Sequence, residues 1–199
     1  MMKRLLCSGL VLPAAAMLLV AVSPAGAEET VLVPFGSTVR YATFAGGQGD
    51  VPEEVNGVGY DDSGWALGTA PFGWSDEVYC PLDAVTPWPL GTTIVARVWV
   101  DLPPGSRDLR FQRRMISYSG ISINGYGFGS CSGGGSPCPW WLCDQTAPYE
   151  YSGPTLIVVT QETYSWNATW NYMDFQISAD VPPTATDRGT WGTLKVLYR

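Results

Sequence analysis

The chain has 199 residues, of which 46% are hydrophobic, 13% aromatic and 15% charged, and its formal net charge is −7 with no histidine. This length and apolar content predict one or at most two compact domains and argue against a disordered chain. The lack of imidazole excludes Ser/His/Asp triads, Cys/His dyads, histidine-ligated zinc or haem, and a histidine general base.

The first 27 residues have the layout of a secretory signal peptide. Two basic residues precede an apolar run over residues 5–22, and a small-residue cleavage site, Ala25-Gly26-Ala27, follows. An uncleaved anchor is the alternative, because a run of about 18 apolar residues can begin to span a bilayer, but the small-residue ending favours cleavage. We therefore predict a secreted, extracellular protein that is cleaved after Ala27, with residues 28–199 as a single domain and no membrane insertion after cleavage.

Charge limits the partners of the cleaved chain. Loss of the leader reduces the 11 basic residues to nine, against 18 acidic ones, and Lys195 is then the remaining lysine. Nucleic acid and anionic lipid headgroups repel such a chain, because both attract proteins mainly through cationic side chains. We expect neither nucleic acid nor a membrane surface among its partners.

Four cysteines follow the leader, namely Cys80, Cys131, Cys138 and Cys143. An even number in an exported domain predicts two disulfides. Closeness in sequence predicts one bridge within residues 131–143, and the remaining cysteine of that cluster would then pair with Cys80. A four-thiolate zinc site is the less favoured alternative, because the spacing lacks two paired C-x-x-C knuckles.

The elements expected along the chain are β-strands, because helical periodicity is almost absent and glycine and proline recur. Alternation over residues 92–102 predicts a strand with one apolar and one polar-aromatic face, and Leu102-Pro103-Pro104-Gly105-Ser106 predicts a turn after it. Residues 107–123 predict further strand that leads into Asn124-Gly125, a strong hairpin signal.

Later segments complete an all-β pattern. Residues 156–162, 171–180 and 191–198 are predicted as strands, whereas residues 46–89 and 125–154 are rich in Gly and Pro and are predicted as long loops. Strands joined by turns, without crossover helices, predict an antiparallel β-sandwich or jelly roll with long disulfide-tied loops.

One segment carries a family resemblance. Residues 60–74, YDDSGWALGTAPFGW, resemble a motif of secreted bacterial members of the galactose-binding-like jelly-roll family, with two aspartates, a serine, a tryptophan and then G-x-A-P-F-G before an aromatic. In order along the chain, STVRYATF resembles the family's first strand, IVARVWVDL the strand after the motif, ISINGYGF the Asn-Gly hairpin, and GPTLIVVTQE with MDFQISAD the last pair of strands. The resemblance spans residues 37–180.

The chain departs from the family pattern in two places. Members usually have acidic residues and a glycine just before the hairpin, where this chain has Ser117-Tyr118-Ser119-Gly120. The segment from Cys131 to Cys143 is also outside the common pattern. The resemblance implies a β-sandwich used as a carbohydrate-binding or adhesion module, often beside a catalytic domain and sometimes with a structural calcium ion. Fold alone does not settle function.

Two adjacent indoles, Trp140 and Trp141, are the leading candidates for ligand contacts. Aromatic faces stack on the C–H faces of sugar rings, and a loop pinned by disulfides has less ordering entropy to lose on binding. The alternative is that one indole plugs an end of the sandwich. Trp65 and Trp74 are candidates for the wall of a cleft, although packing of the long loop is the favoured interpretation.

Four further residues are weaker candidates. Arg97 and Trp99 share a strand face and are candidates for lining a groove for polar rings, although an outer sheet face covered by long side chains is the favoured interpretation. Asp61 and Asp62 offer oxygen ligands for calcium, although Asp-Ser-Gly is equally a turn signature.

Catalysis without histidine would need two carboxylates at the right separation. Acidic candidates exist at Asp76, Glu77, Glu150, Glu162 and Asp174, but no motif distinguishes a pair. The sequence therefore predicts a secreted, non-catalytic module that binds a carbohydrate or cell-surface glycan. The alternatives are a structural or adhesion component that contacts an envelope protein, and a carboxylate-based glycoside hydrolase.

Overall fold

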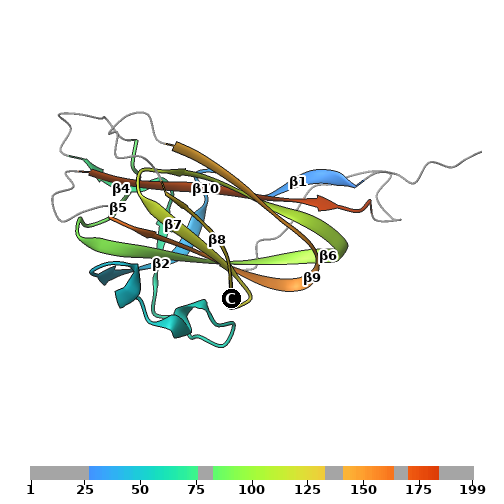
Figure 1. The fold of residues 1–199 in the computed structure, drawn as a ribbon, viewed down its shortest axis with the longest axis horizontal. Helices are drawn as coiled ribbons and strands as arrows, with labels where there is room; N and C mark the ends of the chain where they lie inside the picture. Colours follow the sequence, from blue (N-terminus) through green and yellow to red (C-terminus); the bar gives the residue numbers. More distant parts are fainter. Residues whose placement is uncertain (1–26, 76–82, 133–140, 164–169, 184–199) are drawn as a thin grey trace, which may run out of the picture.

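The structure is a computed structural model that describes residues 27–75, 83–132, 141–163 and 170–183. Ten β-strands and two short 3-10 helices form from these residues (Figure 1). The strands are β1 (Glu28–Val33), β2 (Thr38–Ala45), β3 (Ala66–Thr69), β4 (Phe72–Ser75), β5 (Thr86–Pro87), β6 (Thr92–Met115), β7 (Tyr118–Ile123), β8 (Tyr126–Ser132), β9 (Trp141–Glu162) and β10 (Trp170–Val181). The 3-10 helices, η1 (Gln48–Asp50) and η2 (Glu53–Asn56), lie between β2 and β3.

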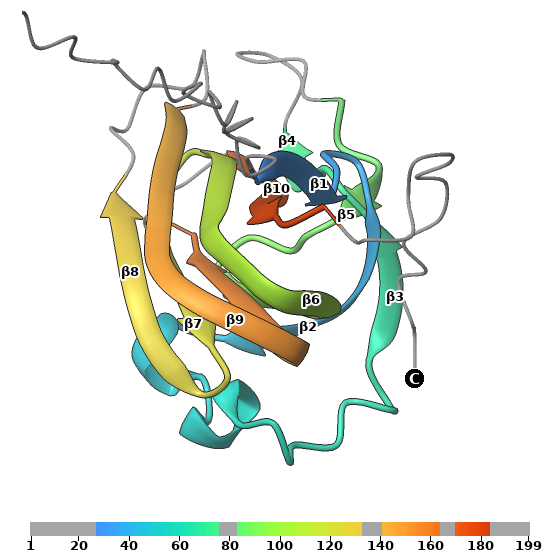
Figure 2. The same ribbon diagram turned by 90° about the vertical axis from the view of Figure 1, so that its right-hand side faces the viewer.

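Two long antiparallel strands, β6 and β9, run through both layers of a sandwich (Figure 2). The first half of β6 pairs with β2, and the second half of β9 pairs with β7, which in turn pairs with β8. The second half of β6 pairs with β10, whose other side holds β1 and β4. The pairing of β4 with β5 is parallel. The predicted all-β sandwich is confirmed.

The Pro-Pro-Gly segment bends β6 and does not reverse it. The pairing register with β9 shifts between Leu102 and Ser106. Gly105 has a φ of 82°, and Gly153 of β9, which faces Leu102, has a φ of 72°, both in the region that favours glycine. The two strands therefore turn the corner together, and the predicted turn over residues 102–106 is wrong. Local turn chemistry is the same in a bulged bend and in a reversal.

Apolar side chains of both layers form one main core. The expected alternation in β6 and β10 is confirmed, because one face of each strand supplies this core: Ile94, Ala96, Val98, Val100 and Leu102, then Leu109 and Phe111, and Met173, Phe175, Ile177 and Ala179. Burial of these side chains is the main favourable contribution to folding.

The two stretches predicted as long loops, residues 46–89 and 125–154, contain strands. The first holds β3, β4 and β5, and the second holds β8 and the start of β9, so this prediction is wrong in part. Among the strands that the structure describes, β3 and β8 each pair with a single neighbour, at the ends of their layer. Glycine in a strand has no side chain to pack and interrupts the alternation of apolar and polar residues, and this hides such strands from pattern analysis.

The G-x-A-P-F-G motif, residues 68–73, builds the corner between β3 and β4. Phe72 is fully buried, and its ring centroid lies 5.0 Å from that of Tyr41. A Cβ atom on Gly68 would lie 2.6 Å from the Tyr41 ring, and one on Gly73 would lie 2.7 Å from the backbone oxygen of Asn171. Close approach of the neighbouring atoms therefore requires glycine at both positions.

Export stays a prediction. Residues 1–26 of the predicted leader and the strand predicted at residues 191–198 lie outside the described residues. Among the residues that the structure describes, no helix has both the length and the apolar character needed to cross a membrane.

Candidate functional site

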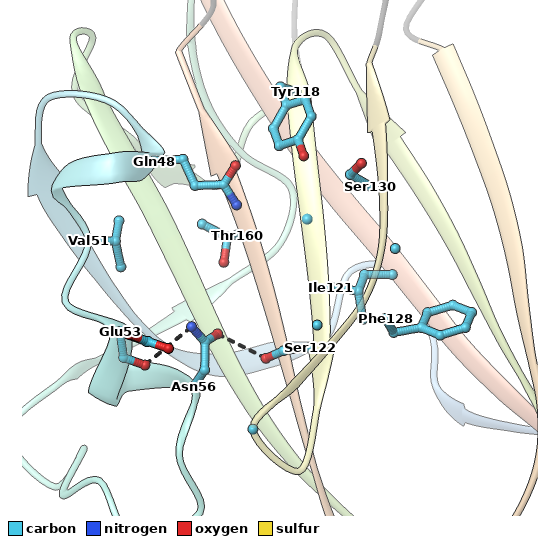
Figure 3. A pocket seen from close by; sticks show the side chains of 14 residues that line it. Gln48, Val51, Glu53, Asn56, Tyr118, Ile121, Ser122, Phe128, Ser130 and Thr160 are labelled. Atoms are coloured by element: carbon cyan, nitrogen blue, oxygen red, sulfur yellow. Dashed lines mark hydrogen bonds between the residues drawn. The ribbon is translucent and has the colours of Figure 1, made fainter.

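A cleft of about 460 Å³ lies between the loop that carries η1 and η2 and the β7–β8 hairpin (Figure 3). We call it the hairpin cleft. Its lining residues are Gln48, Val51, Glu53 and Asn56 of the loop, Tyr118, Gly120, Ile121 and Ser122 of β7, Gly125 of the turn, Gly127, Phe128, Gly129 and Ser130 of β8, and Thr160 of β9.

The hairpin is held in place by its turn. Asn124 and Gly125 have φ values of 51° and 89°, as a two-residue turn of this kind requires, and the predicted Asn-Gly hairpin is confirmed. The Leu156 backbone N–H donates to Asn124 Oδ1 at 2.8 Å, which ties the turn to β9. A Cβ atom on Gly127 would meet nothing within 4 Å, so the β8 backbone is open on this side.

Side-chain amides and hydroxyls cross the cleft. The Ser122 hydroxyl donates to Asn56 Oδ1 at 2.9 Å, and Asn56 Nδ2 donates to the Glu53 backbone oxygen at 3.3 Å (Figure 3). The amide of Gln48 extends from the loop toward β7, where a Cβ atom on Gly120 would lie 2.8 Å from its Nε2. Polar groups thus fix the loop that carries η1 and η2 to β7 across the cleft.

Arg97 is a buried cation beneath the loop. The residue is 3% exposed, and its Nε donates to Asp62 Oδ2 at 2.9 Å. The guanidinium also donates to the backbone oxygens of Val55, Gly57 and Tyr60, at 3.2 Å for Gly57 and 3.3 Å for Tyr60. These bonds satisfy three loop carbonyls at once, and they hold the cleft wall against β6.

Trp65 and Trp99 pack beside Arg97. A second apolar cluster between the loop and the outer face of β6 consists of Val55, Val95, Leu156 and Val158, with Phe44, Val51, Tyr60, Trp65 and Trp99 against it. The Trp65 ring centroid lies 6.0 Å from the Arg97 guanidinium carbon. The structure therefore brings Trp65, Arg97 and Trp99 together under the loop, as packing would require.

Trp74 and Trp141 lie in the other layer. Trp74 pairs with Asn171 of β10 and is 42% exposed. The Trp141 backbone pairs with Met115 of β6, which also pairs with Met173. The register thus places Trp74 and the start of β9 at one end of this layer, away from the Arg97 cluster.

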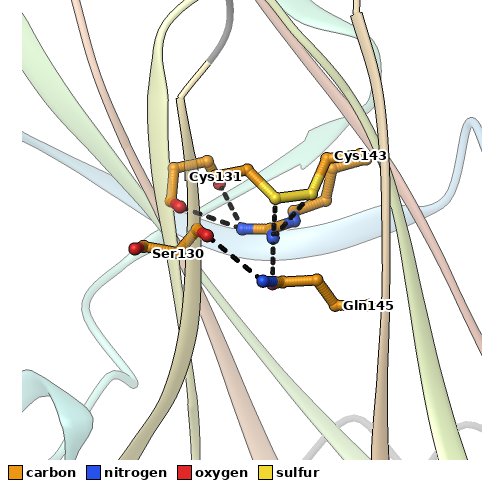
Figure 4. Close-up of a disulfide and its surroundings, with 6 residues drawn as sticks. Ser130, Cys131, Cys143 and Gln145 are labelled. Atoms are coloured by element: carbon orange, nitrogen blue, oxygen red, sulfur yellow. Dashed lines mark hydrogen bonds between the residues drawn. A yellow bond between two sulfur atoms is a disulfide. The ribbon is translucent and has the colours of Figure 1, made fainter.

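The disulfide between Cys131 and Cys143 joins β8 to β9 (Figure 4). The prediction of one bridge within residues 131–143 is confirmed. The bridge connects β8, which pairs with β7 in one layer, to the first half of β9, which pairs with the second half of β6 in the other layer. Cys80, Cys138 and Trp140 lie outside the described residues, so their predicted roles stay predictions.

The carboxylates of Asp61 and Asp62 both have partners within the chain, and the predicted calcium site stays a prediction. The Ser63 backbone N–H donates to Asp61 Oδ1 at 2.9 Å, and the hydrogen bonds from Ser63 lower the pKa of Asp61. Asp62 is paired with the Arg97 guanidinium, which already occupies the point where the loop carbonyls converge. Among the described residues, no group of three or more His, Cys, Asp or Glu is arranged to hold a metal ion.

One buried carboxylate gives a pH-dependent prediction. Burial raises the pKa of Asp174, although the backbone N–H groups of Gly36 and Phe175 donate to its Oδ1 at 3.0 and 2.9 Å and oppose the rise. A raised folded-state pKa disfavours the folded state above that pKa, and this penalty is lost as the pH falls toward the ordinary value. We expect wild type to gain stability relative to Asp174→Asn between pH 7 and pH 4 in urea unfolding. An equal difference at both pH values would contradict this.

The comparisons with known proteins concern the fold. No family model matches the sequence, and no curated protein matches it significantly. A Bacteroides uniformis β-glucuronidase is similar in structure with a TM-score of 0.53 and 16% identity, over 76% of this chain and 18% of that one. The same organism's β-glucuronidase 2, covalently bound to cyclophellitol-6-carboxylate aziridine, has a TM-score of 0.52 and 15% identity over the same shares of the two chains. An uncultured Clostridium sp. β-glucuronidase gives 0.50 and 11%, over 80% of this chain and 30% of that one.

This chain therefore matches less than a third of the length of each of these enzymes. At such low identity the likeness shows the fold alone. The sequence thus folds as an all-β sandwich that is similar to one part of these β-glucuronidases.

Proposed function

We propose that this protein is an exported, non-catalytic carbohydrate-binding protein that holds a glycan in the hairpin cleft. The observation that carries the proposal is the lining of the cleft, to which Gln48, Asn56, Ser122 and Ser130 contribute amides and hydroxyls and Tyr118 contributes an aromatic ring. Amides and hydroxyls donate and accept hydrogen bonds as sugar hydroxyls do, and aromatic rings stack on sugar C–H faces. The cleft volume also falls in the usual range of about 300–1,000 Å³ for small-molecule sites.

Two further points support this ligand class. The similar structures are β-glucuronidases, enzymes whose name gives a carbohydrate substrate, although the match covers only part of each enzyme. Glu53 is the carboxylate among the described lining residues, whereas glycoside hydrolysis by the common mechanism uses two. Binding without turnover is therefore the activity that we propose.

The tryptophans predicted from the sequence stay in the proposal as a separate contact zone. Trp74 is exposed and available, whereas Trp65 and Trp99 are engaged in packing under the loop. Trp140 and Trp141 stay candidates for stacking on sugar rings. This rests only on the presence of two adjacent indoles in the sequence. An envelope protein as the partner stays the alternative.

The test is calorimetric titration of the purified protein with a panel of oligosaccharides and soluble polysaccharides, with and without calcium. We expect Tyr118→Ala to lower the affinity for a binding glycan by about tenfold, the equivalent of about 1.4 kcal/mol, and Gln48→Ala to lower it several-fold. Tyr149→Ala is the matched control, because Tyr149 is 62% exposed and does not line the cleft.

Each outcome decides between the alternatives. Absence of heat with every glycan would overturn the proposed function. Binding that is lost in Trp141→Ala and kept in Tyr118→Ala would move the site to the tryptophan zone. Capture of an envelope protein, with all glycans inert, would favour the adhesion alternative.

A further inference from the structure

Arg113 crosses the interior of the sandwich beside the disulfide. It lies on the core-facing side of β6, two residues after Phe111, and is 1% exposed. Its Nη1 donates to both the backbone oxygen and the hydroxyl of Ser119 on β7, each at 3.0 Å. The guanidinium therefore connects the layer that contains the second half of β6 to the layer that contains β7.

The same guanidinium lies against both sulfur atoms. Arg113 Nη2 is 3.0 Å from Cys131 Sγ and 3.2 Å from Cys143 Sγ, and it also donates to Gln145 Oε1 (Figure 4). Gln145 in turn donates to the Ser130 backbone oxygen at 3.1 Å. The polar network thus surrounds the bond that closes the sandwich between β8 and β9.

The charge of Arg113 is poorly balanced while the disulfide is intact. Burial lowers the pKa of Arg113 to about 10, and the phenol of Tyr118 acts in the opposite direction, so the group is cationic at neutral pH. None of the ion pairs among the described residues includes Arg113. A buried charge without an opposite charge is costly, and disulfide sulfur is a weak, neutral acceptor.

We propose that Cys131–Cys143 is a redox-active disulfide whose reduced form is stabilised by Arg113 as a resident counter-cation. A thiolate beside the guanidinium supplies the negative charge that the oxidised form lacks. Stabilising the reduced form makes a disulfide easier to reduce. This proposal stands on the Arg113 geometry and is independent of the proposed glycan binding.

The exchange is a two-electron step with a dithiol as the reductant. One thiolate of the dithiol attacks either cysteine sulfur, a mixed disulfide forms, and the protein S–S bond breaks with its electron pair on the leaving sulfur. Arg113 Nη2 is within reach of both sulfurs, so either leaving thiolate is stabilised. The second thiol of the reductant then attacks the reductant's own sulfur in the mixed disulfide. The protein sulfur leaves, and the reductant ends as a disulfide. The two cysteines end as one thiolate and one thiol, and the remaining proton goes to solvent.

The position of the bond permits this chemistry. Both cysteines are partly exposed, so a small dithiol can reach them. Opening the bond would free β8, whose one partner among the described strands is β7, from its covalent connection to β9.

The test uses the full protein, reduced with dithiothreitol and alkylated with iodoacetamide at a series of pH values, with peptide mass spectrometry to follow Cys131 and Cys143 separately. We expect at least one of the two thiols to titrate at least one pH unit below the ordinary value of about 8.5. In Arg113→Met the titration returns to that value or above it. In a dithiothreitol redox buffer, the equilibrium constant for reduction falls at least tenfold.

Arg114→Met is the matched control and leaves both readouts unchanged, because the Arg114 guanidinium lies over the Phe35 ring, 4.1 Å from its centroid. Arg113→Lys keeps the charge and keeps the lowered thiol titration. The proposal would be overturned if both wild-type thiols titrate at the ordinary value of about 8.5, whether the reduced protein stays folded or unfolds. An unchanged equilibrium constant in a folded Arg113→Met would also overturn it. If Arg113→Met does not fold, the wild-type titration alone decides.

Discussion

Replacing Arg97 with methionine is expected to lower the free energy of unfolding by about 3–5 kcal/mol, the usual cost of breaking a buried ion pair by removing one partner. The variant leaves the partly buried Asp62 carboxylate without its cation, and the backbone oxygens of Val55, Gly57 and Tyr60 lose their donor. Urea unfolding followed by tryptophan fluorescence measures the change. These carbonyls belong to the loop that also supplies Glu53 and Asn56 to the hairpin cleft, so we expect the affinity for the proposed glycan to fall as well.

Arg110→Met is the matched control for this prediction. Arg110 is on the same strand and pairs with Glu29 at 2.6 Å and with Asp180 at 3.8 Å, but Arg110 and Glu29 are exposed to solvent and Asp180 is partly exposed. Exposed ion pairs contribute about 0–1 kcal/mol, so the control should lose less than about 1 kcal/mol. A loss in Arg97→Met no larger than in Arg110→Met would show that Arg97 does not organise the loop.

Phe72→Ala is expected to cost about 3–5 kcal/mol, as do other truncations of fully buried aromatic side chains. Phe72 is fully buried against Tyr41 and belongs to the main core. The surrounding corner cannot close over the cavity easily, because Gly68 and Gly73 already bring neighbouring atoms close to their backbones. Urea unfolding again measures the loss.

Trp74→Ala is the comparison within the same strand. Trp74 is 42% exposed, so its truncation should cost less than a third of the Phe72→Ala value. Together the two variants separate the structural part of the G-x-A-P-F-G motif from the aromatic residue that follows it. Equal losses would mean that Trp74 is a core residue and not a candidate contact.

Much of the sandwich could be predicted from local patterns. Alternation identifies the core faces of β6 and β10 because each side chain's direction follows from its position in the strand. The Asn124-Gly125 turn is predicted because its dihedral angles demand those residue types. The turn predicted at residues 102–106 is wrong, because whether the chain reverses there depends on pairing with β9, about fifty residues later. Pairing partners at that distance leave no local signal.

The hairpin cleft was not predicted, since its walls come from separate parts of the chain. One signal was present in the sequence, namely the glycines and serines that follow one another through β7 and β8 and leave space above the sheet. Arg97 is predicted on an outer sheet face or in a groove and not under a loop, because alternation shows which side of a strand a residue faces but not what covers that side. Here a loop about forty residues earlier covers it.

The shared ribbon of β6 and β9 has a mechanical consequence. In a sandwich made of two separate sheets, one sheet can shear across the other by sliding side chains past each other. Here the same two strands belong to both sheets, so relative sliding would have to stretch the backbone or break the β6–β9 ladder. The cleft on one sheet and the disulfide between the two layers are therefore both attached to one continuous β6–β9 ladder that resists shear.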